Sequence, residues 1–105
     1  MAQGPLELAI DELYASGWAA LDTTGCQHHS DGRAFPGPLR VQKEFAELGF
    51  ELRIVFVQLF DCYRAEWVDG QGQAVGAVVG SCEVEAAIYA LAQLRKHLHQ
   101  VGARP

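Results

Sequence analysis

Apolar and polar residues alternate along the second half of the chain in a pattern that predicts three β-strands followed by one long helix. From Phe50 to Phe60 both sides of the alternation carry apolar residues, which is typical of a strand covered on both faces. From Cys62 to Trp67 the alternation is strict, which predicts an antiparallel strand with one face in the core. Ala74 to Val79 gives the return strand. Only Asp61 has turn character between the first two segments, so residues 50–68 form either two strands or one long bent strand.

Local turn and cap chemistry joins these elements. Asp69-Gly70-Gln71-Gly72 predicts a tight hairpin turn, because an Asp-Gly pair supplies the positive φ angles of a type I′ turn. Gly76 and Gly80 indicate a bulge or a close approach of the backbone to a neighbour. We expect Ser81 to be the N-cap of the last helix, since its hydroxyl can accept a hydrogen bond from a free amide of the first turn. The apolar stripe of that helix includes Ala87, Leu91, Leu94 and Leu98.

Two shorter helices are predicted before the strands. The first begins at Pro5 and can end at Gly17 in a left-handed cap. The second begins at Pro38 and runs to residue 48, where Gly49 and Phe50 fit a Schellman motif. The chain is therefore expected to be an α+β protein with a three-stranded antiparallel sheet, a long C-terminal helix and one or two N-terminal helices, in α-(α)-β-β-β-α order.

Residues 22–38 consist mainly of Asp, Thr, Gly, His, Ser and Pro, which predicts one long loop. A connection of that length is uncommon in a small domain and is either mobile or functional. The chain has 105 residues and 50% apolar content, so we expect residues 1–105 to form a single globular domain.

Charge and cysteine content limit the classes of partner and compartment. Thirteen acidic and eight basic residues give a formal charge of −5, which disfavours nucleic acid and anionic membranes as partners. The longest apolar run, Ala86 to Ala92, is too short for a membrane span. Three cysteines and an N-terminus without a signal-peptide pattern favour reduced thiols and a cytoplasmic location.

Cys26, His28 and His29 are the candidate metal ligands, since they lie within four residues of the loop. Adjacent histidines diverge, and the sequence holds no second ligand pair of typical spacing. Cys62, His97 and His99 could complete a site only if the loop folds back on the helix end. The competing interpretation is a solvated loop that satisfies its own polar groups, and on balance we expect no cofactor.

Thiol chemistry at Cys26 would need a neighbouring base and a lowered thiol pKa, and His28 offers proximity in sequence only. The glycines after residue 70 lack the Lys-Ser/Thr pair of a phosphate loop. No convergent catalytic constellation is visible, so we expect a protein without catalytic activity.

Candidate interaction residues are Val55, Val57, Leu59 and Tyr89, because they fall outside the clearest core pattern. If an N-terminal helix covers the strand face that bears the first three, they are ordinary core. We expect such cover, since both N-terminal helices have apolar stripes that need burial. If the face is open, it is a surface for a protein partner or for a second copy of the chain.

Residues 38–98, with their hairpin turn and the segment Gly80-Ser81-Cys82-Glu83-Val84-Glu85-Ala86-Ala87 at a helix start, resemble the double-stranded RNA-binding domain in element order. The resemblance implies an α-β-β-β-α fold. It would also imply RNA binding, but Glu83 and Glu85 stand where that family has lysines. The leading hypothesis is therefore a non-catalytic protein-interaction or binding module; the alternatives are an RNA-binding-like domain with lost or altered RNA binding and a metal or thiol site in residues 26–31.

Overall fold

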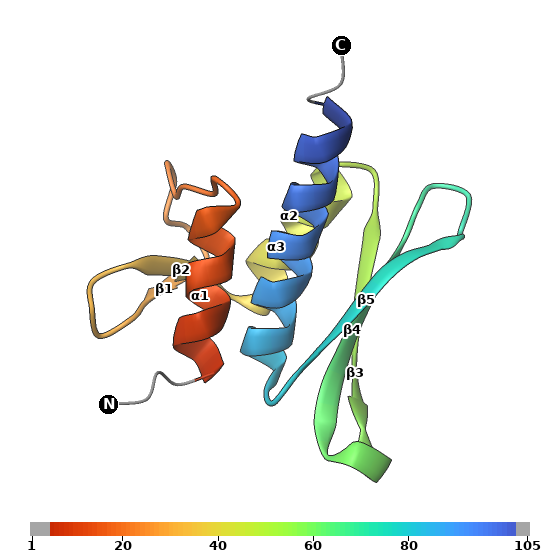
Figure 1. Ribbon diagram of the computed structural model, residues 1–105, viewed down its shortest axis with the longest axis horizontal. Helices are drawn as coiled ribbons and strands as arrows, with labels where there is room; N and C mark the ends of the chain where they lie inside the picture. Colours follow the sequence, from red (N-terminus) through yellow and green to blue (C-terminus); the bar gives the residue numbers. More distant parts are fainter. Residues whose placement is uncertain (1–4, 103–105) are drawn as a thin grey trace.

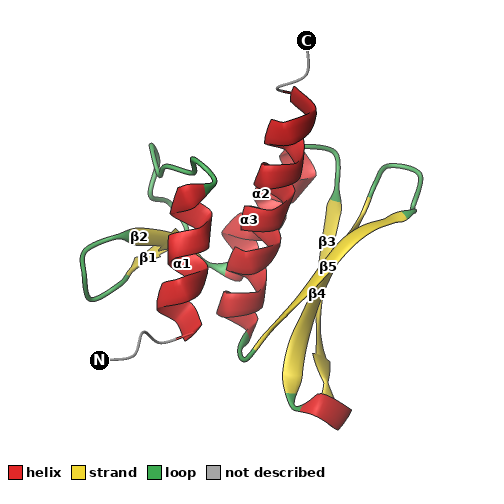
Figure 2. Cartoon of the chain, viewed as in Figure 1, coloured by secondary structure: helices red, strands yellow, loops and turns green. Residues whose placement is uncertain are grey.

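The computed structural model describes residues 5–102 and contains three layers (Figures 1 and 2). Helix α1 (Pro5–Ala15) forms the first layer, helices α2 (Pro38–Glu47) and α3 (Glu83–Gly102) form the second, and a three-stranded sheet forms the third. The sheet contains β3 (Glu51–Val57), β4 (Cys62–Val68) and β5 (Ala74–Gly80). The protein is thus of mixed α+β class, as the sequence predicted.

The three strands are antiparallel neighbours in the order β3-β4-β5. Residues 50–68 form two strands, which a short 3₁₀ turn, η1 (Gln58–Phe60), connects. Asp61 follows that turn with a φ of 49°, a left-handed conformation that aspartate tolerates better than most residues. Its turn character therefore decides between the two possibilities that the sequence left open.

The element order departs from the expected one within residues 22–38. This segment contains a short antiparallel hairpin of β1 (Cys26–His28) and β2 (Ala34–Pro36), where the composition predicted only a loop. Contacts with distant residues hold the hairpin: the Tyr14 hydroxyl donates to the Ala34 carbonyl at 2.7 Å, and Arg33 pairs with Asp11 at 2.7 Å. Composition alone cannot reveal such contacts, because the partners lie 20 and 22 residues apart in sequence.

The predicted caps of the two N-terminal helices are confirmed. Gly17 has a φ of 89° directly after α1, and Gly49 has a φ of 90° after α2. Beyond α2, the amide of Phe50 donates to the Phe45 carbonyl at 2.9 Å and that of Gly49 to the Ala46 carbonyl at 3.0 Å. This pair of bonds defines a Schellman motif.

Two local predictions were wrong in detail. The β4–β5 hairpin forms, but the left-handed residue is Gly72, with a φ of 81°, and Gly70 has no positive φ. A bond from the Gly72 amide to the Asp69 carbonyl closes a three-residue loop in place of a type I′ turn. Ser81 lies before the capping position, since the carbonyl of Cys82 accepts the first helical bond, from Ala86.

Helix α3 is the centre of the core. It packs against α1 on one side and against α2 and the sheet on the other. Residues around much of its circumference are therefore buried, and small alanines allow the neighbouring elements to come close. The buried residues of α3 are Glu85, Ala86, Ala87, Ile88, Ala90, Leu91, Ala92 and Leu94.

Candidate functional site

One face of the three-stranded sheet points away from every described helix. Leu52, Ala65 and Trp67 are buried on the helix side, so the residues that alternate with them point to the other side. Figure 1 shows α2 and α3 on the same side of the sheet and no helix or strand of residues 5–102 on the opposite side. We call that second side the open face; it carries Glu51, Arg53, Val55, Val57, Cys62, Arg64, Glu66, Val68, Ala77 and Val79.

Two exposed valines flank Arg64 across the middle of the open face. Strand pairing places Val55 beside Arg64 and Arg64 beside Val79 in one row across the sheet. Val55 is 49% exposed and Val79 is 61% exposed. A shallow hollow lined by Arg64, Ala77, Val78 and Val79 lies on the β4–β5 side of this row. The row is therefore accessible to a partner.

Two ion pairs lie on the open face, and one of them includes the central Arg64. Arg53 Nε lies 3.2 Å from Glu51 Oε2 on β3, and Arg64 Nη2 lies 3.3 Å from Glu66 Oε2 on β4. Both pairs are well exposed, so water screens them and each contributes little to folding. Two acidic and two basic residues give the open face a net charge of zero, whereas the whole chain carries −5.

The apolar surface continues to the β3–β4 tip, which extends beyond the helices (Figure 2). Leu59 and Phe60 in η1 are 84% and 72% exposed. Phe56 is half exposed, and its ring lies 5.2 Å from the ring of Tyr63. The tip thus exposes large apolar side chains next to the open face.

The expectation that an N-terminal helix covers the face with Val55 and Val57 was wrong. Helix α2 packs on the other side of the sheet, and α1 packs on α3. An apolar stripe shows that a helix needs a partner, but it does not identify the partner. The stripe of α1 is satisfied by α3, and the open face remains without cover from the described part of the chain.

Of the four candidate interaction residues, the structure brings three to one region. Val55 and Val57 lie on the open face, with Val57 partly buried, and Leu59 lies at the tip. Tyr89 is separate: it lies on α3, packs against the core and is only partly exposed. Burial raises its pKa, and the nearby carboxylates of Glu85 and Glu12 act in the same direction.

The sequence interpretation missed Val79 and Phe60. Val78 and Val79 are adjacent in β5, so the two-residue period of a strand indicates that they point to opposite faces. The other residues of that strand are mostly small, so the sequence does not show which of the two faces the helices cover. Phe60 was assigned to the end of a longer strand. Its exposure depends on the 3₁₀ turn, which the sequence did not predict.

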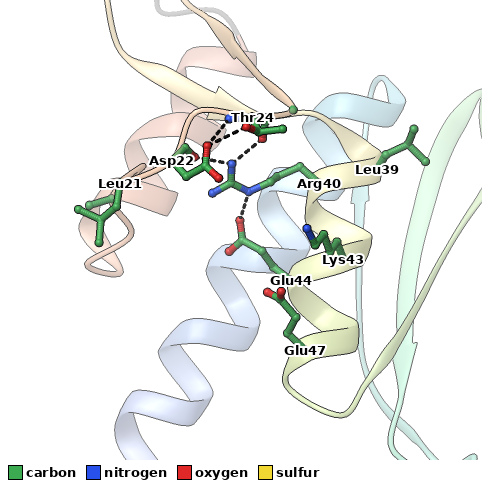
Figure 3. Close-up of a pocket in the computed structure, with 10 residues that line it drawn as sticks. Leu21, Asp22, Thr24, Leu39, Arg40, Lys43, Glu44 and Glu47 are labelled. Atoms are coloured by element: carbon green, nitrogen blue, oxygen red, sulfur yellow. Dashed lines mark hydrogen bonds and ion pairs between the residues drawn. The ribbon is translucent and has the colours of Figure 1, made fainter.

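A second surface feature is a groove between residues 19–25 and α2 (Figure 3). Arg40 lies at its centre and donates to the carbonyls of Asp22 and Thr24 at 2.5 and 2.6 Å. The Arg40 Nε donates to Glu44 at 2.9 Å, and the same carboxylate accepts a bond from Trp18 Nε1 at 3.2 Å. Arg40 therefore attaches the loop to α2, which is a structural role.

The candidate metal ligands do not form a cluster in the described residues. Cys26 Sγ lies 3.5 Å from Arg40 Nη1, and His29 Nε2 lies 3.7 Å from a Glu7 oxygen. His97 lies elsewhere, beside Trp67 and β5, and the side chain of His99 is outside the described residues. Within the described part of the chain, no three His, Cys, Asp or Glu side chains are placed to hold one metal ion.

The geometry also works against a reactive thiol at Cys26. Burial raises the pKa of the Cys26 thiol, and the nearby Glu44 and Asp22 carboxylates add to the effect, although Arg40 opposes it. A nucleophilic cysteine needs the opposite shift, since the thiolate is the reactive form. The local environment therefore keeps this thiol protonated at neutral pH.

None of the helices in the described region is both long enough and apolar enough to cross a bilayer. Comparison with protein-family models, with curated proteins and with solved structures finds no match to this chain. The resemblance to the double-stranded RNA-binding domain therefore gains no support from them.

Proposed function

We propose that this chain is a non-catalytic protein-interaction module that binds its partner through the open face of the sheet. The observation that carries the proposal is the uncovered row Val55–Arg64–Val79, in which both valines are about half exposed or more. Isolated apolar residues are normal on protein surfaces, but a group on one sheet face, continuous with an apolar tip, is typical of an interaction site.

The charge of the surface favours a protein partner over a nucleic acid. The open face is neutral, so it offers no net attraction to a phosphate backbone. Helix α3 begins with Glu83 and Glu85, and acidic groups at that end repel phosphate. A partner with an apolar surface and a few charges of both signs fits the open face better.

A photo-crosslinking experiment in the cells that make the protein tests the proposal. We would replace Val79 with p-benzoylphenylalanine, which forms covalent adducts with whatever lies within a few ångströms, and use Leu39 as the matched control position. Leu39 is also a strongly exposed apolar residue, but it lies on α2, away from the open face. Val79 should give discrete protein adducts, and Leu39 should not.

Addition of Val55→Glu to the Val79 probe variant should abolish the adducts, because docking would then have to take a charged group out of water where an apolar side chain was. Val55 is exposed in the free protein, so this change should leave the fold unaffected by circular dichroism. Equal adducts from positions 79 and 39, or none from position 79, would overturn the proposal.

A further inference from the structure

We infer that the occupant of the open face is a second copy of this chain, bound face to face about a two-fold axis. This inference rests on the proposed function, since it identifies the partner of the same surface. Three features of the open face support it: its neutrality, its pattern of charges and its size.

Neutrality is the first feature. A chain with a formal charge of −5 repels a second copy unless the contact avoids unpaired negative charge. The open face carries Glu51 and Glu66 against Arg53 and Arg64, so two copies can meet there without an excess of either sign. A strongly acidic or strongly basic partner would gain no net attraction from this face.

The second feature is the order of charges along β4. Arg64 and Glu66 lie two positions apart, on either side of Ala65, and both point to the open face. We place the two-fold axis between the two stacked sheets, perpendicular to β4 and level with Ala65. This axis exchanges positions 64 and 66. Arg64 of one copy then lies over Glu66 of the other, and the reverse contact forms by symmetry. Such an interface is isologous, and Arg64 and Glu66 of each copy gain a partner of opposite sign, while Arg53 and Glu51 keep each other as partners within one copy.

The third feature is size, which sets the expected strength. Three strands about 4.8 Å apart and seven residues long cover roughly 330 Å² in projection. A standard stable interface buries about 800 Å² on each partner. Even with the apolar tip included, the contact is small, so we expect a reversible dimer with a dissociation constant in the micromolar range.

Sedimentation equilibrium of the purified full chain, from about 5 to 500 µM, measures this association directly. The wild-type chain should show a monomer–dimer equilibrium. Ala77→Glu combined with Val79→Glu should weaken it at least about tenfold, since the same axis places position 77 of one copy over position 79 of the other and carboxylates then face each other. Leu39→Glu, which adds a charge to an exposed leucine outside the open face, should leave it unchanged.

A charge-exchange experiment tests the symmetry. In Arg64→Glu the new carboxylate faces Glu66 of the second copy, and in Glu66→Arg two guanidinium groups face each other, so each variant alone should associate at least about tenfold more weakly than wild type. An equimolar mixture of the two variants should associate again, as a heterodimer, because both pairs that positions 64 and 66 form in it are of opposite sign. The weakening in each single variant together with the recovery in the mixture is what an interface in which position 64 meets position 66 of another copy predicts.

Circular dichroism and thermal unfolding of each variant establish that it is folded. A wild-type chain that stays monomeric up to 500 µM would overturn the inference, and so would a mixture that does not associate. Association unaffected by either charge variant would also overturn it and would indicate another geometry, such as edge-to-edge pairing through β5. A monomeric chain that still gives cellular adducts from position 79 to a different protein would refute the second copy but leave the proposed interaction function intact.

Discussion

At the scale of single residues, Gly80 determines how closely β5 approaches α3. A Cβ atom at this position would lie 2.6 Å from the Ala86 nitrogen and 2.9 Å from its Cα. These are backbone atoms at the start of a buried helix, so they cannot move without displacing the helix. The close approach that the sequence suggested at Gly80 is confirmed, and it explains why a strand residue here has no side chain.

Gly80→Ala should therefore destabilise the protein by about 2–3 kcal/mol, the upper part of the range for an overpacked core. Gly70→Ala is the control, because Gly70 has no positive φ and no atom within 4 Å of its virtual Cβ. Urea unfolding followed by circular dichroism gives both free energies. Equal stabilities for the two variants would contradict the packing at Gly80.

Asp22 is a residue whose pKa the loop lowers. The backbone amide of Thr24 donates to its carboxylate at 3.0 Å and the Thr24 hydroxyl at 2.8 Å; these bonds hold its pKa below the ordinary value of 3.8. Because the pKa is lower in the folded state, the stability from this carboxylate is present above the unfolded-state pKa. It is lost as the pH falls through the folded-state pKa.

An NMR titration of the side-chain carboxyl carbons should give Asp22 a midpoint below 3.8. Thr24→Ala removes the hydroxyl bond but keeps the backbone donor, so it should raise that midpoint only part of the way back. Asp31 is an internal reference, since its pKa is lowered mainly by a bond from the Arg33 amide and should not respond to Thr24→Ala. A midpoint for Asp22 at or above 3.8 would refute the hydrogen-bonded loop.

At the scale of elements, the junction of β5 and α3 depends on a carboxylate–hydroxyl pair that the sequence did not predict. Glu85 is the one charged or polar residue buried in the described core; it accepts a bond from the Ser81 hydroxyl at 2.7 Å and from the Ser81 amide at 3.2 Å. Ser81 was expected to accept a hydrogen bond from the helix. Instead its hydroxyl and its amide donate, and the Glu85 carboxylate in the helix accepts both bonds. This arrangement resembles half of a capping box.

Glu85→Ala should lower the stability by about 1–2 kcal/mol, because it removes both bonds and leaves a partly buried amide without its acceptor. Glu83→Ala is the control: Glu83 lies in the same helical turn but is exposed, and its loss should cost about 0.5 kcal/mol through the helix dipole. Ser81→Ala combined with Glu85→Ala should cost less than the sum of the two single changes. Strict additivity would show that the two residues do not interact.

At the scale of the whole molecule, α3 connects layers that do not touch one another broadly. α1 packs on one side of it and the sheet on the other, and Leu91 is fully buried in this central helix. A cavity at Leu91 should therefore loosen the packing of both outer layers. This arrangement predicts that α1 and the sheet unfold together.

Leu91→Ala should cost about 3 kcal/mol, within the range for buried leucines, whereas Leu39→Ala at an exposed site should cost less than about 0.5 kcal/mol. Hydrogen exchange of the Leu91→Ala variant should show reduced protection in α1 and in β4 to a similar degree. Loss of protection in only one of them would show that α3 does not couple the layers.

The sequence by itself determined the elements whose signals are local. The helix ends at Gly17 and Gly49, the antiparallel strands and the position of the hairpin at residues 69–73 follow from backbone preferences and from apolar periods of two and 3.6 residues. These signals depend on neighbours within about five residues, so a single sequence contains them. They were sufficient to predict the α+β class. They were also sufficient to assign three of the four candidate interaction residues, Val55, Val57 and Leu59, to one region.

Only the tertiary structure decided how the layers are stacked. The β1–β2 hairpin exists because Tyr14 and Asp11 of α1 hold it, and the open face exists because α1 packs on α3 and not on the sheet. An apolar stripe specifies that a surface must be buried but carries no information about which surface covers it. The candidate site is therefore exposed because α1 packs on α3. The order of residues along the chain does not reveal which element α1 packs against.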